Sequence, residues 1–312
     1  MNTGHTTRLA LIAFLAGAVL SFLLEHVAGD NARTGEQVLS ARPARRIASL
    51  TPSVTDCVVA LGGTDRLVAV TDFCRLPPEA GELPRLGGHF NPNLERLLAV
   101  QPDLIIVQGR GEFLRSFCRR ERIEVAIVQM TDIDGVLRDL DYLGRVLGVP
   151  DRAEAIRRDV CQTLDSVRRR VAGRPRPRVF LSLYRASGGL GGLSTATGRT
   201  YLGELLTLAG GDNVFGELPA DYPTISKESL WQRQPEIIIE PSLAGALSPA
   251  QEQQRRRDWQ TLGEVPAVRT GRVYFPEGDA LLKPGPRLAQ AALTLAQLIH
   301  PELFDDPQAV AP

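Results

Sequence analysis

Short apolar runs alternate with longer amphipathic segments through most of the chain. The runs predict strands at residues 46–50, 67–70, 104–108, 125–128, 179–183, 237–240 and 273–275. The segments between them predict helices at 93–100, 111–122, 133–147, 200–209 and 286–299, and Thr51 followed by Pro52 opens a further helix after the first strand. Strands that alternate with helices predict a mainly parallel sheet with helices on both faces, so we expect an α/β fold.

The longest predicted helix covers residues 151–172 and carries a single apolar stripe. The stripe repeats at three- and four-residue steps through Ala153, Ile156, Val160, Leu164, Val167 and Val171, and arginines occupy much of the opposite face. A basic helix of this kind can lie on a membrane surface or bind nucleic acid. We favour a solvated spacer helix that packs along one edge of the protein.

A repeat inside the chain indicates how the predicted elements are grouped. Asn93-Leu94-Glu95 leads to Gln101-Pro102-Asp103 and a strand, and Ser226-Lys227-Glu228 leads to Gln234-Pro235-Glu236 and a strand. The offset between the copies is constant at 133 residues, for example from Glu95 to Glu228. The repeat predicts two similar α/β lobes with mainly parallel sheets, bridged by one long α-helix. A ligand cleft is expected between the lobes, at the strand ends.

These patterns divide the chain into segments. We expect a linker at 30–44, an N-terminal lobe at 45–150, the bridging helix at 151–172, a C-terminal lobe at 173–304 and a tail at 305–312. Glu95 and Glu228 lie in the first turn of the repeated helices. They are either partners of the helix dipole or exposed carboxylates that meet two cationic sites on a symmetric partner.

The first 29 residues form a targeting segment. An apolar run from Leu9 to Leu24 lies between Arg8 and Glu25, and its 16 residues are short for a membrane-spanning helix, which needs about 20. The run suits the core of a secretory signal, and Val27-Ala28-Gly29 offers small residues for cleavage. The alternatives are an uncleaved N-terminal anchor and a buried core helix, and the core helix is disfavoured because the run has no amphipathic face. The signal and the anchor both place the rest of the chain outside the cytoplasm, in the periplasm or its equivalent.

Composition excludes several classes of function. The 312 residues carry 36 Lys and Arg against 36 Asp and Glu, so the net charge of zero removes the electrostatic case for a nucleic-acid partner. The lysines are Lys227 and Lys283, and neither lies in the GxxxxGK[ST] setting of a phosphate-binding loop. The glycines at 188–192 lack GxGxxG spacing, so they predict a flexible loop of the cleft. The chain also lacks GxSxG and HExxH, which argues against an exported hydrolase.

The cysteines are Cys57, Cys74, Cys118 and Cys161. No two have C-x-x-C spacing, which excludes a zinc ribbon or a thioredoxin motif. An even number in an exported protein permits up to two disulfides. Cys57 and Cys161 lie at apolar helical positions, so we favour buried free thiols for these two.

A series of short segments carries a resemblance to a known family. The segments are Thr51-Pro52-Ser53-Val54-Thr55, Val70-Thr71-Asp72-Phe73-Cys74, Gly87-Gly88-His89-Phe90, Asn93-Leu94-Glu95 with Pro102-Asp103, Gly210-Gly211-Asp212-Asn213, Ile225-Ser226-Lys227-Glu228 and Pro284-Gly285-Pro286-Arg287. In this order and spacing, over residues 45–300, they resemble the periplasmic substrate-binding proteins of ABC importers for cobalamin and ferric siderophores, most closely the cobalamin-binding branch.

The resemblance implies two lobes bridged by a rigid helix, with little hinge closure and no cofactor of its own. It also implies that a monomer docks on a dimeric permease with its ATPase subunits through one glutamate per lobe, matched here by Glu95 and Glu228. The ligand-binding positions of the family match Phe73, His89, Gln108, Tyr184, Tyr222, Asp279 and Lys283.

Two of these positions depart from the cobalamin branch. His89 and Gln108 stand where large aromatic side chains are expected, which leaves less apolar area for a broad corrin. His89 is either a polar wall of the cleft or a ligand of cobalt or haem iron, since neutral imidazole binds both. Asp279 and Lys283 either hydrogen-bond ligand amides or pair with each other.

We therefore expect an exported binding protein that captures a corrinoid and delivers it to an ABC importer, without chemistry of its own. A ferric-siderophore or haem binder on the same scaffold is the alternative within this class. An exported hydrolase and a membrane-anchored sensor are the alternatives of other classes.

Overall fold

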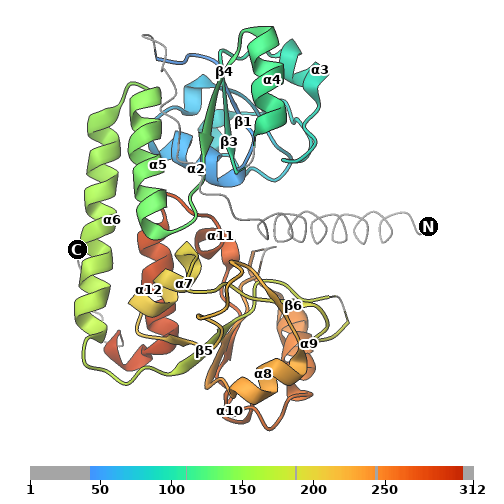
Figure 1. Ribbon diagram of the computed structural model, residues 1–312, viewed down its shortest axis with the longest axis vertical. Helices are drawn as coiled ribbons and strands as arrows, with labels where there is room; N and C mark the ends of the chain where they lie inside the picture. The colour runs from blue at the N-terminus through green and yellow to red at the C-terminus, as the bar shows by residue number, and fades with distance from the viewer. Residues whose placement is uncertain (1–42, 110, 187, 243–244, 305–312) are drawn as a thin grey trace. The chain divides into compact units, whose positions relative to one another are not determined.

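The computed structural model describes residues 43–109, 111–186, 188–242 and 245–304, which form two compact units (Figure 1). The N-terminal unit runs to Ser166 and includes Lys283–Ala291, and the C-terminal unit comprises Val167–Leu282 and the residues from Ala292. The expected α/β class, with parallel sheets in two lobes, is confirmed. Residues 283–291 group with the N-terminal unit, and the segment boundaries expected at 45–150, 151–172 and 173–304 stay predictions. The targeting segment at 1–29, all but the last two residues of the linker and the tail at 305–312 lie outside the described residues.

The N-terminal unit is built on a parallel sheet with the strand order β2-β1-β3-β4. Its strands are β1 (Ile47–Ser49), β2 (Leu67–Val70), β3 (Leu104–Gln108) and β4 (Glu124–Val128). Its helices are α2 (Pro52–Ala60), α3 (Leu94–Ala99), α4 (Glu112–Glu121) and α5 (Ile133–Val146), with 3-10 turns at Thr64–Arg66 and Pro78–Ala80. Figure 1 shows α4 and α5 on opposite sides of this sheet. Every residue of β3 is therefore buried, as in sheets that are covered on both faces.

The C-terminal unit repeats this plan with the parallel order β10-β9-β5-β7. Its strands are β5 (Arg178–Leu181), β7 (Asp212–Asn213), β9 (Ile237–Ile239) and β10 (Val273–Tyr274), and an antiparallel pair consists of β6 (Leu193–Ser194) and β8 (Thr224–Ile225). Its helices are α7 (Tyr201–Leu208), α8 (Lys227–Arg233), α9 (Pro249–Gln260), α10 (Pro266–Arg269) and α11 (Gly278–Leu281), and a 3-10 turn covers Pro301–Leu303. The aromatic part of its core consists of Phe180, Phe215 and Trp259. The ring of Phe180 makes edge-to-face contacts with the other two, with 5.8 Å between ring centroids for Phe215 and 6.1 Å for Trp259.

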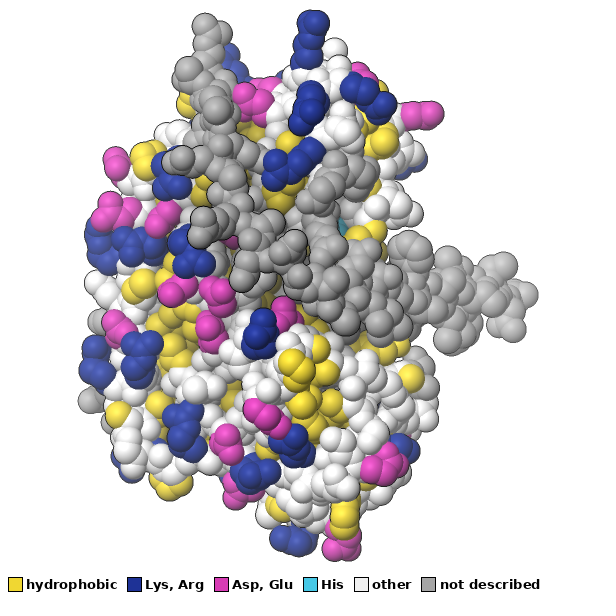
Figure 2. Space-filling model, in the orientation of Figure 1, with side chains coloured by type: hydrophobic (Ala, Val, Ile, Leu, Met, Phe, Trp, Pro, Cys, Tyr) yellow, Lys and Arg dark blue, Asp and Glu magenta, His cyan; other side chains and the backbone are white. Residues whose placement is uncertain are grey.

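The division between the units falls inside two helices, α6 (Pro150–Val171) and α12 (Leu288–Ile299). On α6 the predicted apolar stripe is buried, apart from the half-buried Ile156. Two of its arginines have acidic partners, with Arg157 at 3.3 Å from Asp141 and Arg158 at 3.0 Å from Glu154. Figure 2 shows basic and acidic side chains interspersed along this edge, which favours the solvated helix over a nucleic-acid surface. None of the described helices is long and apolar enough to cross a membrane.

The repeated segment is closed in the N-terminal unit by hydrogen bonds from the start of β1. The Arg46 guanidinium donates to the carbonyl groups of Val100 at 2.7 Å and Gln101 at 2.9 Å, at the end of α3. The Asp103 carboxylate accepts from the backbone N–H groups of Arg45 at 2.8 Å and Arg46 at 3.0 Å. These bonds tie the helix that carries Glu95 to the sheet.

The C-terminal unit forms the same arrangement at the start of β5. The Arg178 guanidinium donates twice to the carbonyl of Arg233, at 2.6 and 3.2 Å, and the Glu236 carboxylate accepts from the Arg178 backbone N–H at 2.8 Å. Each unit therefore has an arginine at the start of its first strand, Arg46 just before β1 and Arg178 as the first residue of β5. The sequence comparison of the two segments did not reveal these arginines.

A buried ion-pair network attaches α9 to the end of β9. Glu240 follows β9, and its carboxylate accepts from Arg185 at 2.9 Å, from Arg255 at 2.7 Å and from the indole N–H of Trp259 at 2.7 Å. Arg185 also donates to Asp258 at 2.7 Å. Burial alone lowers the pKa of Arg185, but the two carboxylates outweigh burial and raise this pKa overall.

Replacing Glu240 with Ala is expected to destabilise the C-terminal unit by about 3–5 kcal/mol, because two arginines and one indole lose a shared buried partner. Urea unfolding followed by tryptophan fluorescence measures this effect, since Trp259 belongs to the network. Glu252 of α9 pairs with Arg256 at the surface, so Glu252→Ala should lower the free energy of unfolding by less than about 1 kcal/mol. Equal losses in the two variants would contradict the stabilising role of the buried network.

Candidate functional site

Three predicted ligand residues lie at the carboxyl ends of adjacent strands in the N-terminal unit. Phe73 follows β2 by three residues, and Gln108 is the last residue of β3. The Nδ1 atom of His89 is 3.2 Å from the carbonyl oxygen of Leu50, which follows β1. Because β2, β1 and β3 are adjacent and parallel, these side chains share one edge of the sheet, where ligands bind in open α/β folds.

The hydrogen bond to Leu50 determines the form of the neutral His89 ring. A carbonyl oxygen only accepts, so Nδ1 must carry the proton and donate it. The lone pair of the neutral ring is then on Nε2, the atom that would coordinate a metal. No cluster of three or more His, Cys, Asp or Glu side chains able to hold a metal ion occurs among the described residues.

The loop that carries His89 is tied to the loop that carries Phe73. The backbone N–H of Asp72 donates to the carbonyl of Gly87 at 3.0 Å, and the Asp72 carboxylate accepts from the Gly87 N–H at 3.1 Å. Gly87 has a φ of 83°, which a glycine adopts without strain. The rings of Phe90 and His89 contact each other edge to face, with 4.7 Å between their centroids, and the Phe90 side chain is 38% exposed. Phe90 is thus a further candidate for ligand contact, and its only sequence signal is its place in the Gly-Gly-His-Phe segment.

Gln108 lies against a turn that a buried carboxylate holds. Its side-chain amide donates to the carbonyl of Gln129 at 3.4 Å. The backbone N–H groups of Gln129 and Met130 both donate to Asp139 at 2.8 Å, although Met130 has a left-handed φ of 52°. Burial of Asp139 raises the pKa of its carboxyl despite these two hydrogen bonds. Asp139 therefore positions the turn after β4 next to Gln108.

Lys283 lies beside an acidic residue of α2. Its ammonium group is 3.8 Å from the Asp56 carboxylate, which also accepts from Arg287 at 2.5 Å. The segment from Lys283 to Arg287 is thereby held against the helix that follows β1. The pairing of Lys283 with Asp279 stays a prediction, and the acidic neighbour seen here is Asp56.

In the C-terminal unit, two predicted residues adjoin the small antiparallel sheet. Tyr184 follows β5 by three residues and forms a bridge with Ser194 of β6, and Tyr222 lies two residues before β8, the partner of β6. Both tyrosines are half-buried. Burial, with a smaller contribution from the Asp221 charge, raises the pKa of Tyr222, so its phenol stays protonated at neutral pH. The third predicted residue, Asp279, is half-buried in α11, after β10.

The glycine-rich segment at 188–192 is a loop, as predicted, and Arg185 is bonded to it. The Arg185 guanidinium donates to the carbonyl of Gly189 at 2.8 Å, and the backbone N–H of Ala186 donates to Gly191 at 2.7 Å. Because Arg185 belongs to the network with Glu240, this loop and α9 are attached to the same buried carboxylate.

The thiols are free in the structure. Cys57, Cys74 and Cys118 are buried, whereas Cys161 is only half-buried, so the expectation of a buried thiol holds for Cys57 and not fully for Cys161. Burial raises the pKa of Cys57, and it raises the pKa of Cys118 to about 11. These two thiols are therefore protonated and unreactive at neutral pH.

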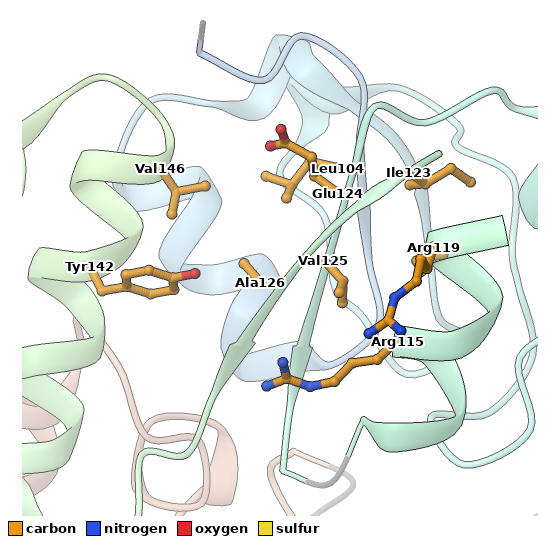
Figure 3. A pocket seen from close by; sticks show the side chains of 10 residues that line it. Leu104, Arg115, Arg119, Ile123, Glu124, Val125, Ala126, Tyr142 and Val146 are labelled. Carbon is orange, nitrogen blue, oxygen red and sulfur yellow. The ribbon is translucent and has the colours of Figure 1, made fainter. Parts of the chain in front are cut away.

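A pocket of about 640 Å³ opens beside the edge strand β4, away from the predicted ligand residues. Figure 3 shows Arg115 and Arg119 of α4 on one side and Tyr142 of α5 on the other, with the side chains of β4 between them. None of the seven predicted ligand residues lines it. We assign no function to this pocket, because the chemistry expected from the sequence lies at the carboxyl ends of the strands.

The two repeated glutamates are exposed on short helices. Glu95 is the second residue of α3 and Glu228 is the second residue of α8. Each lies two positions after the residue whose side chain caps the helix. Asn93 accepts from the backbone N–H of Arg96, and Ser226 performs the same role in α8. Hydrogen bonds from its own backbone N–H and from the Ser226 hydroxyl lower the pKa of Glu228, so this side chain is charged at neutral pH.

Comparison with known proteins extends over most of the chain. The sequence profile of the periplasmic binding protein family matches residues 47–280. A vitamin B12-binding protein of Yersinia pestis (strain Pestoides F) is 32% identical over 203 residues, which cover 64% of this chain and 71% of that protein. The solved periplasmic vitamin B12 binding protein BtuF of Vibrio cholerae is 27% identical with a TM-score of 0.69, over 85% of this chain and 99% of that one. A periplasmic heme binding protein from Pseudomonas aeruginosa is 28% identical with a TM-score of 0.70, over 83% and 93%.

Replacing Asp139 with Asn is expected to stabilise the chain at pH 7 and to have no such effect near pH 3. The pKa of the Asp139 carboxyl is higher in the folded chain than the value of 3.8 taken for the unfolded chain. Such a carboxyl adds its full stabilisation to the folded state below its unfolded pKa, and this stabilisation is lost as the pH rises through the folded pKa. Asn keeps an acceptor for the two backbone donors and does not ionise. Urea unfolding followed by circular dichroism between pH 3 and pH 8 measures the difference.

The matched control is Asp134→Asn on the same helix, where the carboxylate is exposed. This variant should lack a stabilisation that grows with pH. The prediction is contradicted if the free energy of unfolding of the wild type does not fall below that of Asp139→Asn as the pH rises. That result would show that Asp139 ionises without cost.

Proposed function

Since the chain belongs to the periplasmic binding protein family, we propose that it captures a corrinoid outside the cytoplasm and delivers it to an ABC importer. The family binds substrates rather than converting them. We propose further that residues 1–29 are a secretory signal, with an uncleaved anchor as the alternative. The observation that carries the proposal is the gathering of Phe73, His89 and Gln108 at the carboxyl ends of three adjacent strands.

The proposed ligand residues suit a broad ring with amides at its edge. In the N-terminal unit, Phe73 and Phe90 offer apolar area, and Gln108 offers an amide that both donates and accepts. In the C-terminal unit, Tyr184 and Tyr222 offer phenol hydroxyl groups and Asp279 offers a carboxylate. Lys283 adds a positive charge next to Asp56. The relatives named for vitamin B12 support a corrinoid as the ligand.

Haem is the second candidate, because the relative from Pseudomonas aeruginosa is named for heme and imidazole also binds haem iron. In either case His89 would use Nε2, since Nδ1 donates to Leu50. The remaining alternative, a ferric siderophore, offers no open metal position for an imidazole. A corrinoid and haem therefore both predict coordination by His89, and a ferric siderophore predicts none.

Titration with aquocobalamin and with cyanocobalamin tests both the ligand and the role of His89. We expect saturable binding of both by calorimetry. We also expect a shift of the visible cobalt band with aquocobalamin alone, because its axial water exchanges for imidazole while cyanide is retained. His89→Gln should abolish the shift. The affinity of this variant for cyanocobalamin should stay within about tenfold of the wild-type affinity, because the free energy of roughly one contact is lost.

Haemin and a ferric hydroxamate serve as the competing probes. Saturable binding of haemin with a shifted Soret band, and no heat with either cobalamin, would replace the corrinoid by haem. Binding of the ferric hydroxamate alone would replace both. A spectral shift that persists in His89→Gln would show that the metal has another ligand or none from the protein.

We propose that the glutamates Glu95 and Glu228 dock the chain on the permease dimer. Each is exposed, and the two occupy equivalent places in the repeat. The double variant Glu95→Gln, Glu228→Gln should abolish uptake of radiolabelled ligand and leave ligand affinity unchanged, because both carboxylates lie outside the proposed ligand residues. The exposed residues Glu121 and Glu264, one in each unit, provide the control double variant. Normal uptake by the first double variant would refute docking through these residues.

A further inference from the structure

A large apolar side chain stands exposed beside each repeated glutamate. Among the described residues, the exposed large hydrophobic side chains are Phe90, Leu98 and Trp231. Leu98 lies in α3 three residues after Glu95, and Trp231 lies in α8 three residues after Glu228. Leu98 and Trp231 are therefore equivalent in the repeat, at the same offset of 133 residues that relates the two glutamates.

Helical geometry puts each glutamate and its apolar neighbour on one face, because residues three apart are adjacent on a helix surface. Leu97 and Leu230, which are also equivalent, are fully buried. Each helix thus packs one apolar residue into its core and leaves the next one exposed, at 39% for Leu98 and 51% for Trp231. A large part of each of these two apolar side chains therefore stays open to solvent.

Single exposed apolar residues are common on protein surfaces. Leu98 and Trp231 differ from such residues because the same pair of a carboxylate and a large apolar side chain recurs once per unit. A partner with two equivalent faces would select this recurrence, and the permease dimer of the proposed function is such a partner.

We propose that Leu98 and Trp231 are apolar anchors that enter pockets on the permease, next to the basic groups that bind Glu95 and Glu228. The proposal rests on the proposed docking function. A buried apolar centre with a charged group beside it is the usual composition of a protein interface, and Trp is among the residues most enriched at its energetic centre. Anionic lipid headgroups would repel the adjacent carboxylates, and a symmetric contact between two copies would bring like carboxylates together.

Binding of the full chain to its own permease–ATPase complex in nanodiscs tests the anchors. Trp231→Ala should weaken binding by about thirtyfold, the range of an interface hot spot, and Leu98→Ala by less because Leu buries less area. The exposed neighbour Gln232→Ala should leave binding unchanged. Because salt screens charges and not apolar contacts, the anchor variants should keep the salt dependence of the wild type, and Glu95→Gln with Glu228→Gln should lose it.

Fluorine NMR of the chain labelled with 5-fluorotryptophan gives a readout that a folding defect does not imitate. The chain has two tryptophans, Trp231 and the buried Trp259, so two signals are expected. Only the Trp231 signal should shift when the permease complex is added, and Trp231→Phe assigns it. Neither signal should shift with empty nanodiscs or with rising concentration of the chain alone.

The outcomes separate this proposal from the docking function on which it rests. If the glutamate variants fail to bind while the Leu98 and Trp231 variants bind normally, docking stands and the anchors are refuted. If the glutamate variants also bind normally, the docking function itself is refuted. A Trp231 shift with empty nanodiscs would assign the side chain to lipid, and a shift with concentration alone would assign it to a second copy; either overturns the proposal.

Discussion

Each repeated helix is held to its sheet by hydrogen bonds between residues far apart in the sequence. Arg46 binds the carbonyl groups at the end of α3, and Arg178 binds the carbonyl group at the end of α8. The last carbonyl groups of a helix have no partner within it, and a guanidinium satisfies them while it favours the negative end of the helix dipole. Because α3 and α8 are short, their orientation depends on these bonds. The orientation of Glu95 and Glu228 depends on them in turn.

The carboxyl edges of the two sheets are organised by buried carboxylates rather than by apolar packing alone. In the N-terminal unit, Asp139 holds the turn after β4 and thereby supports Gln108. In the C-terminal unit, Glu240 holds Arg185 and α9, and Arg185 holds the glycine-rich loop. A buried carboxylate with several donors has one favourable geometry, so it orders loops that carry few apolar residues. Among the proposed ligand residues, Gln108 lies directly against one such turn.

Prediction from sequence succeeded where apolar periodicity was strong. β3 and α5 were expected within a residue or two of their ends, because buried parallel strands are continuous apolar runs and α5 has one apolar face. Prediction failed for α9, since Trp259 is the one buried residue of that helix and the rest of it is polar. The strands β6 and β8 were also missed, because two residues are too few for any period to be visible.

The sequence by itself determined the α/β class, the internal repeat and the family resemblance, because these depend on the spacing of apolar residues and on short local motifs. Residues brought together from distant parts of the chain were decided only by the tertiary structure. Examples are the bond from His89 to Leu50, the position of Lys283 beside Asp56, and the exposure of Leu98 and Trp231. The physical reason is that a hydrogen-bond partner and a solvent-exposed face are properties of the packed chain, and no local pattern encodes which side of a short helix meets the core.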